Sequence, residues 1–191
     1  MSGVEEVRRR VPPLGERTVA DLYRSFALHY RTELLGGHFV RPCPQTSFHS
    51  LMVDLLVAAL RACCPPAFEV ERQMAVVLGA HDVLIPDVSV VRAEAVRGWG
   101  QDRFEAADLV LAVEVQEPWT RERDEAAKPP RYAAAGVPHV WQVSPVGPEV
   151  RTYAREGPRG YAWTGTYRER LRVAAPYPLD VDISRAALRR S

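Results

Sequence analysis

Residues 85–91 read IPDVSVV, residues 109–116 read LVLAVEVQ, and residues 123–128 read RDEAAK. The first two segments each contain a short, β-branched apolar run bounded by polar or turn-forming residues. Runs of this kind are typical of buried strands. We therefore expect two strands in the centre of a sheet, around which the rest of the chain is organised.

The second run carries one carboxylate, Glu114, among apolar residues. A buried strand seldom carries an ionised carboxylate without a partner, because desolvating a charge is expensive. Side chains alternate along a strand, so Glu114 and Gln116 are expected to point the same way, on the face of Val110 and Ala112. The other face is expected to carry Leu109, Leu111, Val113 and Val115.

The order of these residues resembles the PD-(D/E)xK nuclease superfamily. In that superfamily an Asp after a Pro and an acidic residue on the next strand bind a divalent metal. A Lys two positions after the second acid assists the attacking water. The corresponding residues here are Pro86-Asp87 and Glu114-Val115-Gln116, so Gln116 stands where the superfamily has the Lys.

Within the superfamily, the chain is similar to the Uma-two family of restriction-endonuclease-like proteins. Its members carry a PD strand, a strand ending Val-Glu-Val, and a helix with Asp, Lys and Tyr at four-residue steps. That helix is followed by Ala-Gly-Val-Pro and an aromatic strand. The matching residues here are Asp124, Lys128, Tyr132, the segment 135–138 and Val140-Trp141, and the resemblance covers residues 18–183.

The resemblance implies a metal site. Asp87 and Glu114, helped by the main-chain carbonyl of Val115, are expected to bind Mg²⁺ or Mn²⁺, because oxygen ligands suit these ions. Lys128 is expected to orient or deprotonate the attacking water, or to neutralise the developing charge. Gln116 is expected to position that water, since an amide accepts a proton poorly.

Three further residues are candidates for accessory roles. Glu33 falls where the family has a Glu-Leu pair, and superfamily members often add a third acidic residue near the metal; a solvated strand Glu is the alternative. His49 lies in the first turn of an expected helix, where the family often has a His; a partly exposed helix-start His is the alternative. Asp124 belongs to the helix motif of the family.

The composition is that of a soluble globular protein. The chain has 191 residues, of which 47% are hydrophobic and 26% are charged, and no apolar run approaches the roughly 18 residues of a membrane span. We expect a flexible arm over residues 1–17 and one domain over residues 18–191. Three cysteines without metal-ligand spacing, and no hydrophobic signal core at the start, predict a cytoplasmic protein.

Charge gives no general argument for nucleic acid, because the formal net charge is +1. Affinity for DNA must come from a local cluster or from an oligomer; arginine patches could contribute, although solvated surface arginine is the alternative. Lys128 is the only lysine among 25 basic residues. Lysine differs from arginine in its compact ammonium and tunable pKa, which agrees with the role that the resemblance implies for Lys128.

The remaining patterns predict helices over residues 18–28 and 48–63, a third helix from Thr120, a hairpin over 32–40, and strands over 68–78, 137–144, 150–153, 161–163 and 179–183. Residues 93–106 are expected to form a polar loop or short helix beside the site.

Pro129-Pro130 should break or kink the third helix at Lys128, because proline removes a backbone donor and disfavours helical geometry before it. These elements predict an α/β fold in which helices flank a mixed sheet and an N-terminal helix and hairpin precede it. The resemblance implies that its core is restriction-endonuclease-like.

The resemblance implies a metal-dependent endonuclease that hydrolyses phosphodiester bonds in DNA. A homodimer is expected, because a two-fold pair of sites cuts both strands of a duplex most simply. The alternative is a catalytically weak or inactive nuclease-fold module that binds nucleic acid or a partner protein. The chain has no Gly-rich phosphate loop and no Gly-x-Ser-x-Gly elbow that would support nucleotide binding or an esterase.

Overall fold

The structure is a computed structural model that describes residues 15–25, 31–144, 147–157 and 160–184; the side chains of residues 122–124 are outside the description. Most of the expected N-terminal arm, residues 1–14, therefore lies outside the described residues. None of the described helices is long and apolar enough to cross a membrane.

The central sheet has six strands in the order β11-β10-β9-β8-β6-β3. Its strands are β3 (Phe68–Arg72), β6 (Val88–Arg92), β8 (Leu109–Val115), β9 (His139–Ser144), β10 (Glu149–Arg155) and β11 (Tyr161–Tyr167). Strands β8 and β9 are parallel, whereas the other neighbours are antiparallel. Parallel strands need a crossover connection, and helix α3 (Arg121–Ala134) supplies it.

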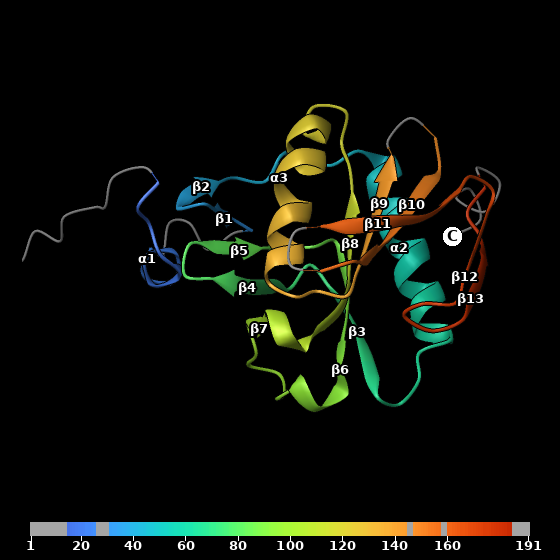
Figure 1. Ribbon diagram of the computed structural model, residues 1–191, viewed down its shortest axis with the longest axis horizontal. Helices are drawn as coiled ribbons and strands as arrows, with labels where there is room; N and C mark the ends of the chain where they lie inside the picture. Colours follow the sequence, from blue (N-terminus) through green and yellow to red (C-terminus); the bar gives the residue numbers. More distant parts are fainter. Residues whose placement is uncertain (1–14, 26–30, 145–146, 158–159, 185–191) are drawn as a thin grey trace, which may run out of the picture.

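A second sheet has five strands in the order β2-β1-β5-β4-β7 and lies beside helix α1 (Figure 1). Its strands are β1 (Glu33–Leu35), β2 (His38–Val40), β4 (Ala75–Gly79), β5 (Asp82–Leu84) and β7 (Arg103–Glu105). The other elements are α1 (Val19–Arg24), α2 (Ser47–Ala62), the 3-10 helices η2 (Ala93–Ala95) and η3 (Ala106–Asp108), and the hairpin of β12 (Arg170–Val173) and β13 (Leu179–Asp182).

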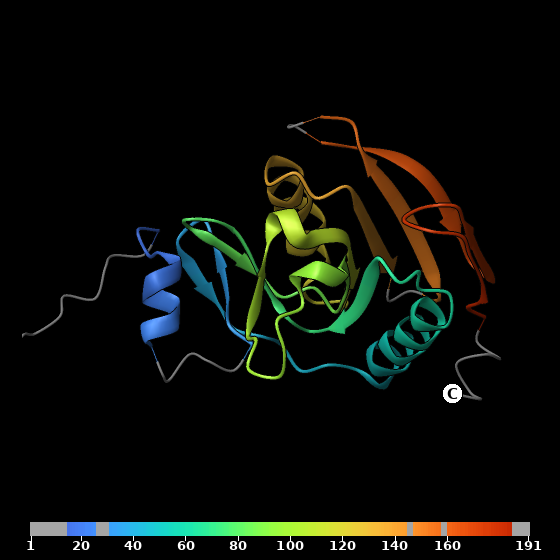
Figure 2. The same ribbon diagram turned by 90° about the horizontal axis from the view of Figure 1, so that it is seen from below.

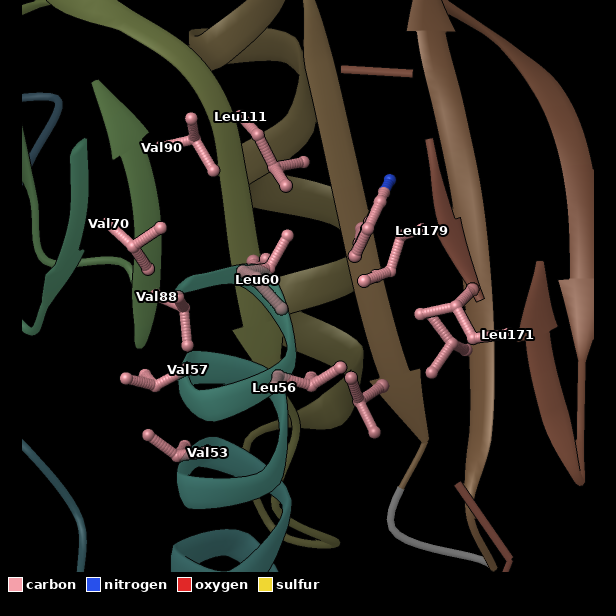
Figure 3. Close-up of a cluster of buried hydrophobic side chains, with 14 of the residues drawn as sticks. Val53, Leu56, Val57, Leu60, Val70, Val88, Val90, Leu111, Leu171 and Leu179 are labelled. Carbon is pink, nitrogen blue, oxygen red and sulfur yellow. The ribbon is translucent and has the colours of Figure 1, made fainter. Parts of the chain in front are cut away.

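Helices α2 and α3 cover opposite faces of the six-stranded sheet (Figure 2). The buried stripe of α2 follows the 3.6-residue period of a helix and packs on strands β3, β6 and β8 (Figure 3). Fully buried members of this cluster include Leu56, Leu60, Val90 and Leu111. Truncating one of them, as in Leu60→Ala, should cost about 2–5 kcal/mol of stability.

The opposite face of the central sheet shares a core with the five-stranded sheet. Leu84 and Phe104 from the five-stranded sheet pack in one cluster with Ala112 and Val140 of the central sheet and with Tyr132 of α3. The two sheets and α3 therefore hold one another in place, and the ends of β1, β6 and β8 come together.

Several expected elements are confirmed. Thr18 and Asp21 form the capping box of α1, as expected, but the helix ends at Arg24 with Ser25 as its C-cap, earlier than the expected end at residue 28. Residues 26–28 lie outside the described residues. The glycine hairpin and helix α2 have the expected limits within a residue. The later strands β9 to β11 and β13 also form, and Trp141 is buried.

The expected alternation along β8 is confirmed from Leu111 onward and is wrong for Leu109 and Val110. Strand β8 pairs with β6 across an irregularity, because Val90 lies opposite Leu111 whereas Val91 lies opposite Leu109. This bulge leaves Val110 without a partner and places it in the α2 cluster, while Leu109 joins the other cluster. A β-bulge reverses the alternation in this way because it adds one residue to one strand.

The expected strand over residues 68–78 is wrong in one respect, because it is two strands in two different sheets. Gln73 adopts a positive φ of 55°, which turns the chain between β3 and β4. Residues 93–106 are also not only loop and short helix, since they include β7, which pairs in parallel with β4.

The expected break of the third helix at Lys128 is wrong. Helix α3 runs without interruption from Arg121 to Ala134 with both prolines inside it. Thr120 stands at its N-cap, although its side chain makes no capping hydrogen bond. Side-chain contacts on both sides of the prolines, from Lys128 to Glu114 and from Arg131 to Asp82, offset the lost backbone hydrogen bonds.

Candidate active site

A pocket of about 80 Å³ lies where β1, the start of β6, the end of β8 and the helices α2 and α3 meet. Its lining is mostly polar, and much of it is charged. The lining residues are Arg31, Glu33, Arg41, Pro42, Cys43, Gln45, His49, Ile85, Asp87, Glu114, Val115, Glu117, Thr120 and Lys128.

Asp87 is held in the pocket by hydrogen bonds to both of its carboxylate oxygens. Oδ1 lies 3.0 Å from Nε2 of His49, in the first turn of α2, and Oδ2 accepts a 2.9 Å hydrogen bond from the main-chain amide of Val115. The main chain of Asp87 is fixed as well, because its amide donates to the carbonyl of Val113. Pairing between the start of β6 and the end of β8 therefore sets the position of this carboxylate.

Glu114 projects from β8 toward helix α3, and its side chain is buried. Lys128 Nζ donates to Glu114 Oε2 at 2.7 Å, and the hydroxyl of Tyr132 donates to Oε1 at 2.6 Å. Residues four apart lie on one face of a helix, which explains why Lys128 and Tyr132 reach the same carboxylate.

Lys128 bridges two carboxylates. Its Nζ also lies 3.0 Å from Oε1 of Glu33, and that oxygen accepts a 3.0 Å hydrogen bond from the amide of Ile85. Both Glu33 and Lys128 are buried. The alternative of a solvated Glu33 is therefore excluded, and the alternative of an exposed His49 is excluded by its burial in the same pocket.

The pocket brings several buried ionisable side chains close together. Burial raises the pKa of Glu114 to about 8; the Lys128 ammonium lowers it, whereas the negative charges of Glu33 and Asp87 raise it further. Burial, followed by the neighbouring Glu114 carboxyl, raises the pKa of the Tyr132 hydroxyl well above its ordinary value. Tyr132 is therefore a hydrogen-bond donor at neutral pH.

Glu117 extends this polar network to the start of α2. Its Oε1 accepts hydrogen bonds from the amide of Thr46 at 2.7 Å and from the Thr46 hydroxyl at 3.2 Å, and it lies 3.6 Å from Nδ1 of His49. His49 thus stands between Asp87 and Glu117. His49 Nδ1 and Glu117 Oε2 are buried and have no hydrogen-bond partner within the described residues, so the network can accept a further polar group.

One sequence candidate, Gln116, does not line the pocket, and a second, Asp124, cannot be placed relative to it. Gln116 is 2% exposed, its amide nitrogen Nε2 has no partner within the described part of the chain, and it does not line the pocket. The side chain of Asp124 lies outside the described residues. Residues 93–106, expected beside the site, also contribute nothing to the lining.

Sequence reasoning assigned no role to Tyr132, Glu117, Arg31 or Arg41. A role for Tyr132 could have been predicted from the sequence, because its spacing of four residues from Lys128 places both on one helix face. Glu117 follows Gln116 directly and could be suspected as a carboxylate near the end of a buried strand. Arg31 and Arg41 flank the first hairpin, and only the tertiary fold brings them to the pocket.

The residues present are chemically suited to a divalent cation. No group of three His, Cys, Asp or Glu side chains in the described residues is arranged as a metal centre. Asp87, Glu114 and the Val115 carbonyl nevertheless offer the oxygen ligands that Mg²⁺ and Mn²⁺ prefer. Each carboxylate oxygen has two lone pairs, so oxygens that already accept one hydrogen bond can take a further partner. A cation would also compensate the buried negative charge.

Comparison with solved structures identifies the fold. The chain is similar to the crystal structure of a "putative nuclease belonging to DUF820" from Anabaena variabilis, with a TM-score of 0.62 and 17% sequence identity; the match covers 82% of this chain and 88% of that one. The likeness supports the expected mixed α/β fold of a nuclease-like core. No curated protein matches the sequence.

The sequence profile of the Uma2 family, described as "Putative restriction endonuclease", matches residues 20–186. This range contains all of β1 to β13 and every residue that lines the pocket. The resemblance that the PD strand, the Val-Glu-Val strand and the Lys128 helix indicated is therefore confirmed, and the chain belongs to the Uma2 family.

Proposed function

We propose that this protein is a metal-dependent nuclease that hydrolyses phosphodiester bonds in DNA. One observation carries the proposal: two buried carboxylates, Asp87 directly before β6 and Glu114 on the neighbouring β8, line one pocket with the only lysine of the chain. Buried charges that converge on a pocket are candidates for function, because burial and charge repulsion destabilise the protein. Membership of a family described as restriction endonucleases supports the same chemistry.

Asp87, Glu114 and the main-chain carbonyl of Val115 would hold one Mg²⁺ or Mn²⁺ ion. When bound, such an ion stabilises charge on the phosphate and lowers the pKa of a bound water. Hydrogen bonds already position the carboxylates that would bind the ion. His49 and the Val115 amide orient Asp87, and Tyr132 orients Glu114.

Lys128 would supply the positive charge that hydrolysis of a phosphate requires. Its ammonium is held by Glu33 and Glu114 and lines the pocket. It can orient the attacking water through its N–H groups and can neutralise charge that develops on the phosphate oxygens. Gln116 has no part in the proposal, because it does not line the pocket.

A second candidate is a module that binds nucleic acid or a partner protein without cleaving it. The observation that favours this candidate is that each oxygen of Asp87 and Glu114 already contacts a protein group. Such carboxylates could serve mainly to fix the ends of the strands.

A cleavage assay separates the two candidates. Supercoiled, linear duplex and single-stranded DNA are incubated with the protein in Mg²⁺, in Mn²⁺ and in EDTA. The nuclease proposal expects metal-dependent cleavage that Asp87→Asn abolishes. The matched control Asp102→Asn, at an exposed loop position outside the pocket, should cleave normally. Binding without cleavage of any of these DNA forms by the folded wild type would favour the second candidate.

We also propose that the protein acts as a homodimer when it cuts duplex DNA, because a two-fold pair of sites can address both strands. Light scattering at micromolar concentration, with and without a duplex oligonucleotide, measures the assembly. A monomer in both conditions would contradict the dimer and would leave the proposal for the pocket intact.

A further inference from the structure

The turn that joins β8 to α3 carries an exposed tryptophan, Trp119, between two residues that line the pocket. Glu117 and Thr120 are both buried and line the pocket, and Trp119 lies between them in sequence with 56% of its surface exposed. An indole left in water forgoes the favourable burial of its ring and offers a face on which a planar group can stack.

This turn is held in one conformation. The Glu117 side chain binds the amide and hydroxyl of Thr46, while its main-chain carbonyl accepts hydrogen bonds from the amides of Thr120 at 3.1 Å and Arg121 at 3.0 Å. Pro118, which lies between Glu117 and Trp119, further restricts the main chain of the turn. The backbone that carries the Trp119 indole is therefore preorganised, so a ligand that contacts the ring need not order the turn.

Two arginines line the same pocket. Arg41 is exposed and makes no ion pair within the described residues. Arg31 has a left-handed main chain with φ of 57°, its Nη2 lies 4.0 Å from Asp87 Oδ1, and its Nε is buried without a hydrogen-bond partner in the described chain. Guanidinium groups with unused donors bind phosphate oxygens well, because their planar fork matches two oxygens at once.

We propose that this edge of the pocket binds an unpaired nucleotide: the Trp119 indole stacks on its base, and Arg31 and Arg41 bind the phosphates of the strand. The inference rests on the proposed function, since it names the form of nucleic acid that the pocket takes. A base inside a duplex is already stacked on both faces, whereas an unpaired or extruded base offers a free face to an aromatic side chain. The preferred substrate is therefore single-stranded DNA or a duplex with an unpaired base.

The inference can be tested by binding alone, without added metal, so that no cleavage is needed. Fluorescence anisotropy compares a labelled oligothymidylate with an abasic oligonucleotide of the same length and the same number of phosphates. Trp119→Ala should weaken binding of the oligothymidylate by about tenfold or more, which is the range of base–aromatic stacking. It should leave the abasic probe unchanged, and Trp119→Phe should retain most of the affinity.

Two control variants make the result specific. Trp163 is 64% exposed on the edge strand β11, no residue of which lines the pocket, so Trp163→Ala should leave both probes unchanged. Arg41→Gln should weaken both probes by the same factor, because it removes a phosphate contact. Equal losses in Trp119→Ala and Trp163→Ala, or equal losses on both probes in Trp119→Ala, would overturn the proposal.

The outcome separates this inference from the nuclease proposal. A wild type that cleaves DNA while Trp119→Ala binds both probes normally would overturn the inference and leave the nuclease proposal standing. A wild type that shows the Trp119-dependent preference for the oligothymidylate but cleaves nothing in Mg²⁺ or Mn²⁺ would support the inference and remove the nuclease. A wild type that binds neither probe would overturn the inference.

Discussion

The ammonium of Lys128 lies 2.7 Å from Oε2 of Glu114, although two prolines follow Lys128 directly in helix α3. Helix α3 therefore continues through Pro129 and Pro130, each of which removes a backbone hydrogen bond. A buried ion pair whose partner is removed leaves an uncompensated charge. The position of Lys128 on α3 is thus coupled to the carboxylates of Glu33 on β1 and Glu114 on β8.

Removing the hydroxyl that binds Glu114 should weaken both stability and activity. Tyr132→Phe takes away the 2.6 Å hydrogen bond to Oε1 and should lower the free energy of unfolding by about 1–2 kcal/mol, with slower cleavage. Tyr161→Phe is the matched control, because its hydroxyl binds the Val137 carbonyl outside the pocket. Denaturant melts and cleavage rates measure both; equal cleavage by the two variants would show that Tyr132 does not position Glu114.

The raised pKa of Glu114 should make metal-free stability depend on pH. The folded carboxyl holds its proton up to about pH 8, whereas the unfolded chain releases it near the ordinary value of 4.5. The folded state therefore binds more protons between these values, and the free energy of unfolding should fall as pH rises from about 4.5 to about 8. Glu114→Gln should flatten this slope. Urea melts in EDTA at several pH values measure it, and parallel curves for wild type and variant would contradict the assignment.

The prolines of α3 should cost stability. Pro130 is exposed, so Pro130→Ala restores a backbone donor within a continuous helix and should raise the free energy of unfolding by about 2 kcal/mol, less than the full interior cost because alanine also frees the unfolded chain. Pro148→Ala, in the turn before β10, is the control and should not stabilise the protein. A destabilised Pro130→Ala would mean that the ring itself supports α3.

A metal site at Asp87 and Glu114 should appear as thermal stabilisation. A ligand of the folded state that is present at 100 times its dissociation constant adds about 2.7 kcal/mol, which should raise the melting temperature by about 5 °C or more in a chain of this size. Millimolar Mn²⁺ should produce this shift in the wild type and in Asp102→Ala, and not in Asp87→Ala. The same shift in all three proteins would place the ion elsewhere.

The parts of the site that follow local rules could be predicted from the sequence. The alternation of a strand places Glu114 away from Leu111 and Val113, and the four-residue step of a helix brings Lys128 and Tyr132 together. These relations depend only on backbone geometry, so the family motif and the structure agree on them.

Other features depend on register and tertiary contacts, which local rules do not contain. The bulge at Val110 changes which face Leu109 occupies, and the positive φ of Gln73 divides the single strand expected over residues 68–78 between two sheets. Gln116 lies just beyond the end of β8, where the direction of its side chain depends on the turn that follows, and it does not line the pocket. The continuity of α3 likewise depends on contacts that Lys128 and Arg131 make with distant strands.

Replacing the only lysine with arginine tests the central claim, that the Lys128 ammonium takes part in hydrolysis. Arg is larger, planar and effectively never deprotonated, and a misplaced group at a reacting centre can cost roughly a hundredfold in rate. The measurement is a time course on one supercoiled DNA substrate with Mn²⁺, alongside melting curves. We predict that Lys128→Arg unfolds cooperatively and is still stabilised by Mn²⁺, but cleaves roughly a hundredfold more slowly. Cleavage at the wild-type rate would contradict the account.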